Sequence, residues 1–300
     1  YINRSLFKNI LPDDCVRADE PMKNHVSFKT GGNAALFVTP QSEKQLIDVI
    51  NTLNSSGEQY FVMGNGSNLL VSDSGFDGVV VCIGKGMADV SADGERICAM
   101  AGASLSKIAS VALKNNLTGF EFASGIPGTL GGAVMMNAGA YGGEMKDVVV
   151  STRYLAPSGD IKEFTGDEHG FGYRKSNFKD GDVILSSVIE LKHGNGEDIR
   201  SLMNELNSRR REKQPLEYPS AGSTFKRPEG YFAGKLIDDA GLRGFRLGGA
   251  MVSQKHCGFV INYDNAASGD IYNLMEYVKN EVFKKFSVVL EPEVRLLGKF

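Results

Sequence analysis

Two glycine-rich stretches constrain this chain more than any other feature of its sequence. The chain has 300 residues, of which 36 are glycine, and seven of these fall within residues 124–143 (SGIPGTLGGAVMMNAGAYGG). A shorter stretch, MGNGSNLL, covers residues 63–70. Because a glycine inside regular structure costs roughly 0.5–1 kcal/mol relative to alanine, such clusters need a compensating use. We expect either turns that require positive φ or a ligand that approaches the backbone closely.

The shorter stretch predicts a phosphate-binding loop that is not of the Rossmann type. The GxGxxG fingerprint requires a helix directly after it and an acidic residue about 20 positions further on. Here Leu69, Leu70 and Val71 are followed by SDSGFDG, which predicts a turn, and the chain has no GxxxxGK[ST] motif. Successive backbone amides can instead form a nest that donates to phosphate oxygens. We therefore expect the amides of residues 64–68 to bind phosphate.

The longer stretch repeats this pattern without a single charged side chain. Neutral amides are suited to a pyrophosphate held inside a protein, where fixed dipoles replace water. The alternative is a pair of tight turns with no ligand. Because both stretches occur in one chain, we interpret them together as the cofactor cradle of a soluble enzyme.

Composition and charge exclude several other classes of protein. Hydrophobic residues make up 42% and charged residues 23% of the chain, with a net charge of −3, so we expect roughly two or three globular domains and no general attraction to nucleic acid. No apolar run approaches the ~20 residues that span a bilayer, and the N-terminal residues lack the apolar centre of a signal peptide. The cysteines show no zinc spacing, so we predict free thiols, a cytoplasmic protein and no metal.

Hydrophobic periodicity predicts helices and strands in mixed order, which indicates an α+β fold with several sheets. We expect helices over residues 42–57, 104–116, 197–213 and 269–286, the first with a capping box formed by Ser42 and Gln45. Strands are expected over residues 34–40, 60–64, 78–84, 95–103, 148–157, 182–193, 257–264 and 289–298. Breaks near residues 78 and 200 would divide the chain into domains 1–78, 79–200 and 201–300.

Three further segments carry candidates for chemistry. Arg174 in GYRKSNF could hold a carboxylate with two parallel hydrogen bonds. Ser223 in PSAGSTFKRP lies outside any GxSxG motif and has no convincing His/Asp partners, so we interpret it as a hydrogen-bonding or proton-donating hydroxyl rather than a nucleophile. For each residue the alternative is an ordinary surface arginine or turn serine.

The strand expected over residues 289–298 would place Glu291, Glu293 and Arg295 on one face, because side chains alternate along a strand. A surface ladder of charges is the alternative interpretation. The basic run 209–211 is interpreted as a solvated helix end, where cations are favoured by the helix dipole.

In this order the motifs resemble those of the UDP-N-acetylenolpyruvoylglucosamine reductases, from about Asn24 to Gly298. The matching segments are NHVSFKTGGNA, GNGSNLL, SGIPGTLGGAVMMNAGAYGGE, GYRKSNF, PSAGSTFKRP, AGLRGFRLGGAMVSQKHCGFVIN and LEPEVRLLG. The resemblance implies two N-terminal FAD-binding subdomains of the vanillyl-alcohol-oxidase type and a C-terminal α+β substrate-binding domain. At this length the chain is similar to the shorter class, which lacks an extra substrate-covering loop.

The resemblance also implies the reaction, in which hydride passes from NADPH through non-covalent FAD to the β-carbon of an enolpyruvyl ether. Arg174 would neutralise the developing enolate, Ser223 would protonate it, and Glu293 would help to polarise or orient that site. The residues implied to bind FAD are Gly64, Asn65, Gly66, Ser67, Asn68, Leu69, Ser124, Gly125, Ile126, Pro127, Gly128, Gly131, Gly132, Asn137, Gly139 and Ala140.

Contacts with the UDP-sugar substrate or its diphosphate are implied for Tyr173, Lys213, Arg227, Arg243, His256 and Arg295. One departure from the family pattern is Met251, where a glutamine is the rule. We further expect a monomer without nucleic-acid or membrane partners. Two alternatives remain at this stage: an oxygen-using flavin oxidase of the same fold, and a non-catalytic module that binds a sugar nucleotide.

Overall fold

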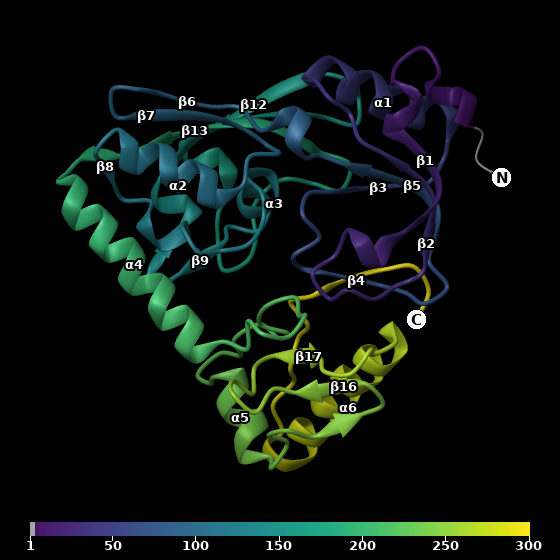
Figure 1. The fold of residues 1–300 in the computed structure, drawn as a ribbon, viewed down its shortest axis with the longest axis vertical. Coiled ribbons are helices and arrows are strands. Elements are labelled where there is room, and N and C mark those ends of the chain that lie inside the picture. The colour runs from purple at the N-terminus through teal and green to yellow at the C-terminus, as the bar shows by residue number, and fades with distance from the viewer. Residues whose placement is uncertain (1–3) are drawn as a thin grey trace. The chain divides into compact units, whose positions relative to one another are not determined.

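The computed structural model describes residues 4–300 and divides into two compact units. Unit 1 consists of the N-terminal segment through Arg17, Phe37–Asn65 and Val79–Arg210. Unit 2 consists of Ala18–Leu36, Gly66–Gly78 and Arg211–Phe300. Each unit is therefore assembled from segments that are distant in the sequence, as the colours along the ribbon show (Figure 1).

The larger sheet of unit 1 has five antiparallel strands in the order β12-β11-β13-β7-β6. Helices α2 and α3 pack on one face of this sheet (Figure 1). The apolar face predicted for residues 104–116 is the buried face of α2, which is capped by the Ser104 hydroxyl. The bounds are Val90–Asp93 (β6), Arg96–Met100 (β7), Leu105–Lys114 (α2), Leu130–Met135 (α3), Val149–Leu155 (β11), Ile161–Thr165 (β12) and Val183–Glu190 (β13).

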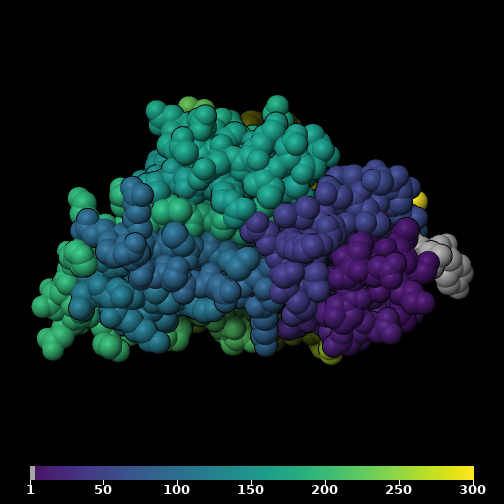
Figure 2. All heavy atoms as spheres, turned by 90° about the horizontal axis from the view of Figure 1, so that it is seen from above, coloured from purple at the N-terminus to yellow at the C-terminus, as the bar shows by residue number. Residues whose placement is uncertain are grey.

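Strands β1 (Val16–Pro21), β2 (Asn33–Val38), β3 (Tyr60–Met63) and β5 (Phe76–Cys82) form a second sheet, in the order β1-β2-β5-β3. Helix α1 (Glu43–Ser56) precedes β3, which pairs in parallel with β5. The Ser42 hydroxyl caps α1 by accepting from the Gln45 amide, but the Gln45 side chain accepts from the Gln41 amide and not from Ser42. The predicted capping box is thus only half formed. Figure 2 shows the N-terminal residues beside the segment that contains α1, where Thr39 donates to the Cys15 carbonyl.

Unit 2 packs a three-stranded antiparallel sheet against helix α6 (Ser268–Phe286). Its strands are β15 (Arg246–Leu247), β16 (Ala250–Val252) and β17 (Val260–Asn262), with α5 (Ala233–Asp239) beside α6. The first turn of α6 is capped by Asp73, whose carboxylate accepts from the Ser268 and Gly269 amides at 2.8 Å each. A parallel pair, β4 (Leu69–Val71) and β18 (Arg295–Leu297), joins the short glycine-rich stretch to the C-terminal segment.

The remaining elements are short, except for helix α4 (Gly196–Lys213). Strands β9 and β10 form a small hairpin within and just after the long glycine-rich stretch, and β14 pairs with β8. Their bounds are Leu117–Thr118 (β8), Gly139–Ala140 (β9), Gly143–Glu144 (β10) and Lys192–His193 (β14). The 3-10 helices span Arg4–Phe7, Asp13–Cys15, Met22–Asn24, Lys85–Met87, Glu121–Ala123, Met145–Asp147 and Gly166–His169.

The predicted α+β fold is confirmed, and all four predicted helices are present. Helices α3 and α5 were not expected from the sequence. The prediction of one strand over residues 289–298 is wrong, because the chain bends at Val294 and changes its pairing partner there. Phe225 bridges to Pro292 before the bend, and β18 pairs with β4 after it. Among residues 4–300, no helix is long and apolar enough to cross a membrane.

Candidate active site

In unit 1, the first glycine of the short stretch, Gly64, packs against the long glycine-rich stretch. A Cβ atom on Gly64 would lie 2.3 Å from Thr129 Oγ1, well inside any permissible contact. Thr129 belongs to the long stretch and is the residue just before helix α3. The amides of Leu130 and Gly131 donate to the carbonyls of Ala103 and Ala101, at 2.8 and 2.9 Å. Gly64 is therefore required by the packing of the protein against itself, and this contact joins the start of the short stretch to the long one.

Gly132 differs from Gly64 because nothing in the protein requires a glycine there. The nearest heavy atom to a Cβ at this position, Thr129 Oγ1, is 3.9 Å away, which is an ordinary contact, and the backbone of Gly132 is not left-handed. A glycine within a helix costs about 1 kcal/mol relative to alanine. The space above Gly132 is thus kept open at a cost in stability, as expected where a ligand lies against the backbone.

Arg174 is held beside the end of the long stretch. Its Nη2 atom lies 3.4 Å from the Gly139 carbonyl oxygen, and its backbone has φ 52°, in the left-handed region. The buried Asn137 side chain donates to the Gly172 carbonyl at 3.0 Å and accepts from the Lys146 amide at 2.9 Å. A left-handed non-glycine residue costs of order 1–3 kcal/mol and marks a position that the surroundings determine. The guanidinium thus contacts Gly139, and Asn137 ties the segment just before Arg174 to the long stretch.

In unit 2, backbone pairing brings the segments of Ser223 and Glu293 together. The Glu293 amide donates to the Thr224 carbonyl at 2.9 Å, and Thr224 donates to the Gly258 carbonyl at 2.8 Å. Asn68, in the short glycine-rich stretch, donates from Nδ2 to the Glu293 carbonyl at 3.0 Å. Ser223 itself is exposed, and Glu293 is half-buried. A proposed flavin-loop residue, a proposed proton donor and a proposed carboxylate therefore lie on hydrogen-bonded neighbouring segments.

The predicted substrate contacts of unit 2 have varied surroundings. The Arg227 guanidinium lies 4.6 Å from the centroid of the exposed Phe232 ring. Arg243 binds Asp238 with two hydrogen bonds, of 2.9 Å from Nε and 2.7 Å from Nη2, so its guanidinium already has a partner. This pairing raises the pKa of Arg243 and lowers that of Asp238.

His256 is half-buried and has a defined tautomer. Its Nδ1 atom accepts a 3.0 Å hydrogen bond from the Gly258 amide, so the neutral ring carries its proton on Nε2. Burial lowers the pKa of His256, and the charge of Arg243 lowers it further. The ring is therefore suited to donate a hydrogen bond while remaining uncharged.

Several other candidate residues have defined local surroundings. Gly66 accepts from the Ser27 amide at 3.1 Å, and Ala140 pairs with Gly143 in the small hairpin. Tyr173 is half exposed, with the Arg174 guanidinium 5.4 Å from its ring centroid. The departure at Met251 has a local explanation, because the side chain is buried with Phe259 and Ile261, where an amide would lose its solvent. Lys213 and Arg295 are exposed.

Comparisons with known proteins identify the family. The description "UDP-N-acetylenolpyruvoylglucosamine reductase, C-terminal domain" matches residues 214–297, and an FAD binding domain matches residues 34–165. The reductase of that name from Caldanaerobacter subterraneus subsp. tengcongensis is 52% identical over 292 residues, which cover 97% of this chain and 96% of the relative. The chain belongs to the UDP-N-acetylenolpyruvoylglucosamine reductase family. The Clostridioides difficile reductase is 50% identical, over 99% of this chain and 97% of its own.

Solved structures agree with this family and with the predicted fold. The UDP-N-acetylenolpyruvylglucosamine reductase from Thermus caldophilus superimposes with a TM-score of 0.81 and 32% identity, over 94% of this chain and 98% of its own. The glucose dehydrogenase Phl p 4.0202 has a TM-score of 0.52 at 13% identity over 64% of this chain and 44% of its own, a likeness of fold alone. The predicted FAD-binding fold of the vanillyl-alcohol-oxidase type, followed by a C-terminal α+β domain, is thus confirmed.

Four residues near the predicted site were missed by sequence reasoning. Thr129 packs against Gly64, Asp238 pairs with Arg243, and Asn207 and Arg210 lie against Gly125. The spacing of Asn207 and Arg210, three residues apart on one helix face, is a signal that the sequence does contain. The packing of Thr129 against Gly64 has no local signal, because the two residues are far apart in the chain.

Proposed function

We infer that this chain is an NADPH-dependent, FAD-containing oxidoreductase of peptidoglycan precursor synthesis. It reduces the enolpyruvyl ether of UDP-N-acetylglucosamine enolpyruvate to the lactyl ether of UDP-N-acetylmuramate. The observation that carries this inference, beside membership of the family, is the hydrogen-bonded chain of segments from Asn68 to Glu293 and Thr224. It links the loop expected to hold the cofactor with the residues expected to act on the substrate.

The residues of the glycine-rich stretches fit FAD. The stretch 124–143 has no charged side chain, and the open space above Gly132 permits a ligand to lie on the backbone. We propose that residues 64–69 and 124–140 hold the flavin nucleotide without a covalent bond, since neither range contains a histidine. When bound, FAD supplies the redox chemistry that carries a hydride from NADPH to the β-carbon of the vinyl group.

The protein must then stabilise the negative charge that develops on the substrate and supply a proton to it. Hydride addition at the β-carbon leaves an enolate on the neighbouring carbon and carboxylate, and the fixed guanidinium of Arg174 would stabilise that charge. The exposed hydroxyl of Ser223 would donate the proton to the enolate carbon, because an enolate is a strong enough base to take a proton from a positioned alcohol. Glu293 would orient or polarise the same site. Tyr173, Lys213, Arg227, Arg243, His256 and Arg295 would bind the UDP-sugar.

The visible absorption spectrum of the purified protein is the most direct test. We expect a yellow protein whose flavin band bleaches on addition of NADPH and returns when the enolpyruvyl sugar nucleotide is added without oxygen. Colourless protein that cannot be reconstituted with FAD would falsify the proposal. Rapid re-oxidation by oxygen with an alcohol substrate, and indifference to NADPH, would instead identify a flavin oxidase.

We further propose that the protein acts in the cytoplasm as a monomer, without nucleic-acid or membrane partners. The cytoplasm is where free UDP-sugar nucleotides and NADPH would both be available to it. The sedimentation of the purified protein, with and without substrate, tests the oligomeric state.

A division of the chain into parts 1–78, 79–200 and 201–300 stays a prediction, and limited proteolysis tests whether those boundaries are accessible.

A further inference from the structure

The three consecutive arginines at the end of α4 have different surroundings. Arg209 forms an ion pair with Glu205, one turn earlier on the same helix, and Arg211 is exposed. Arg210 is half-buried. Within residues 4–300, the structure gives Arg210 neither a carboxylate partner nor a hydrogen-bond acceptor. The interpretation of this run as a solvated helix end therefore holds for its neighbours and not for Arg210.

Arg210 lies against the long glycine-rich stretch. A Cβ atom on Gly125 would lie 3.4 Å from Arg210 Cδ and 2.2 Å from Asn207 Oδ1, so both side chains of α4 rest directly on that glycine. Asn207 Nδ2 also lies 3.5 Å from Ser124 Oγ. Arg210 thus brings a positive charge to a stretch that has no charged residue of its own.

A half-buried guanidinium without a partner is costly, because its charge loses solvation and the group cannot give up its proton. Burial lowers the pKa of Arg210, and Tyr141 opposes this shift. The cost would be offset by an anion that arrives with a ligand. A guanidinium binds phosphate with two parallel hydrogen bonds, and the Asn207 amide can add a third donor.

We propose that Arg210, together with Asn207, binds a phosphate group of one of the nucleotide ligands. The identity of these ligands rests on the proposed function: the phosphate belongs either to the resident FAD or to the exchanging nucleotides, NADPH and the UDP-sugar. Arg210 is a binding residue in this proposal. Its role is distinct from that of Arg174, which is held at Gly139 in the same stretch and acts on the enolate.

The test compares Arg210→Met with the matched control Arg209→Met. Methionine keeps much of the aliphatic stem that covers Gly125 but removes the charge, so the variant separates ligand binding from packing. FAD affinity is measured by titrating apoprotein with FAD and following flavin fluorescence. Affinities for the UDP-sugar substrate and for NADP⁺ are measured from the perturbation of the flavin spectrum in holoenzyme, without turnover.

We expect Arg210→Met to weaken one of these three affinities about 10- to 100-fold, the effect of removing one charged hydrogen-bonding group. Arg209→Met should change each of them less than about twofold, as for an exposed ion pair. Loss of FAD affinity alone assigns the phosphate to the flavin, and loss of substrate or NADP⁺ affinity assigns it to the exchanging ligands. Arg210→Lys, which keeps the charge without the fork, should give an intermediate loss.

Unchanged affinities for all three ligands in Arg210→Met would overturn the proposal, as would equal losses in Arg209→Met. If the methionine variant does not fold, Arg210→Lys decides by the same criteria. Because every readout is a binding constant, the result is independent of the proposed reaction. A wild-type protein that binds FAD tightly yet never reduces the enolpyruvyl ether would disprove the function and leave the role of Arg210 open to the same measurement.

Discussion

The two units differ in the kind of candidate residues that each carries. In unit 1, Gly64 and the long glycine-rich stretch offer backbone and space, and their proposed function depends on the absence of side chains, as at Gly64 and Gly132. In unit 2 the site consists of functional side chains, Ser223 and Glu293, carried on segments that backbone hydrogen bonds align. Substitutions that add atoms should therefore weaken cofactor binding or stability in unit 1. Substitutions that remove a functional group should lower turnover in unit 2.

The largest effect should follow from the loss of one hydroxyl in unit 2. Ser223→Ala should lower turnover by about 10²–10⁴-fold, the usual contribution of a positioned general acid. Flavin reduction by NADPH should be unchanged, because that step does not use the proton of Ser223. Stopped-flow absorbance separates the two half-reactions. Ser220→Ala, on the same segment, is the control, and an equal loss in both half-reactions would remove Ser223 from the role of proton donor.

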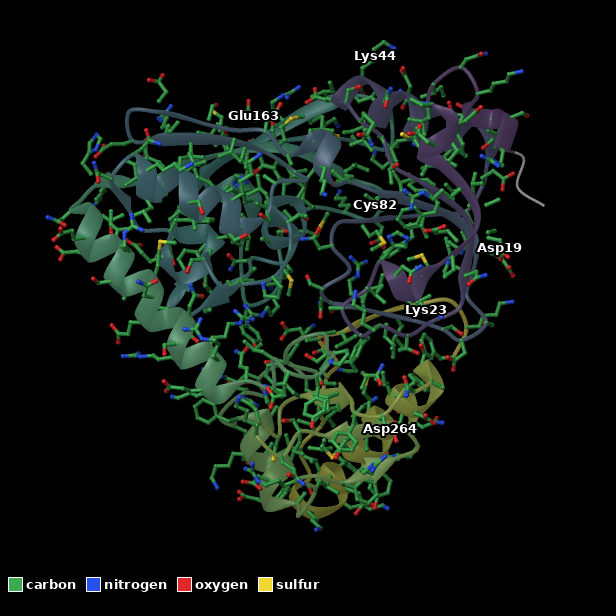
Figure 3. All side chains as sticks on the ribbon, in the orientation of Figure 1. Asp19, Lys23, Lys44, Cys82, Glu163 and Asp264 are labelled. Carbon is green, nitrogen blue, oxygen red and sulfur yellow. The ribbon has the colours of Figure 1, made fainter. Side chains whose placement is uncertain are left out.

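If unit 1 contributes backbone and space rather than reactive side chains, Cys82, which lies near Gly64, should not be a reactive thiol. Figure 3 shows Cys82 among the strands, whereas Lys44 of α1 points away from them. Burial raises the pKa of Cys82 to about 11 from 9.0, and Arg17 opposes the shift only weakly. The thiolate fraction, and with it the alkylation rate at pH 8, should be about 100-fold lower than for an ordinary thiol.

Mass spectrometry after timed alkylation checks this prediction, with the exposed Cys98 as the internal reference. The rate at Cys82 should rise steadily as the pH approaches 11, because only the thiolate reacts. Fast labelling of Cys82 at pH 8 would show that unit 1 has a reactive side chain next to Gly64, and the contrast between the units would fail.

A methyl group at Gly64 should destabilise unit 1, because its Cβ would overlap Thr129 Oγ1. We expect Gly64→Ala to lower the free energy of unfolding by about 1–3 kcal/mol, as for other overpacked positions, and to reduce the flavin retained per chain. Urea titration and flavin absorbance measure the two effects. Adding Thr129→Ala should restore most of the stability; a double variant as unstable as the single one would place the strain elsewhere.

Gly132→Ala tests the contrast with Gly64, because the new methyl group should clash only with a bound ligand and not with the protein. The apoprotein should be unchanged or more stable by up to about 1 kcal/mol, since alanine is the better helix former. FAD affinity should fall, because the Cβ occupies the open space above the backbone. Unaltered FAD binding with a more stable apoprotein would mean that the flavin does not lie against this residue.

The smallest effect concerns His256 in unit 2, whose pKa is lowered by burial and by Arg243. A lowered pKa in the folded state means that the unfolded chain takes up the proton first, so stability is full above the unfolded pKa of about 6.5 and declines as the pH falls below it. His256→Asn keeps an acceptor for the Gly258 amide but does not titrate. Denaturant unfolding at pH 8 and pH 5.5 should show a smaller loss of stability in the variant; an equal loss in both proteins would assign the pH dependence to other groups.

Local signals in the sequence were sufficient for the long helices but not for pairing between distant segments. Helices α1, α2, α4 and α6 follow from apolar periodicity and, for α1 and α2, from serine caps. Helix α3 was missed because Gly131 and Gly132 lower its helix propensity. The strand expected over residues 289–298 failed because its two halves pair with residues near 225 and with β4. The two compact units combine segments that are distant in the chain, an arrangement for which the sequence has no local signal.

For the site, motifs located individual residues, and the fold supplied the relations between them. Arg174, Ser223 and Glu293 could be proposed from sequence motifs, but the bond from Asn137 to Gly172 and the bond from Asn68 to Glu293 could not. Arg210 illustrates the limit most clearly. Its burial depends on Gly125, which lies far away along the chain, so a basic helix end gave no reason to separate it from Arg209.

The parallel pairing of β4 with β18 has a consequence for synthesis on the ribosome. Leu69–Val71 emerges early, but its strand partner Arg295–Leu297 is translated more than two hundred residues later, at a rate of about 5–20 residues per second. Asn68 meets Glu293 and Arg295 only after that delay. The strand that follows the proposed flavin-binding loop can therefore pair only after residues 295–297 have been synthesised, and we expect a nascent chain to bind FAD late.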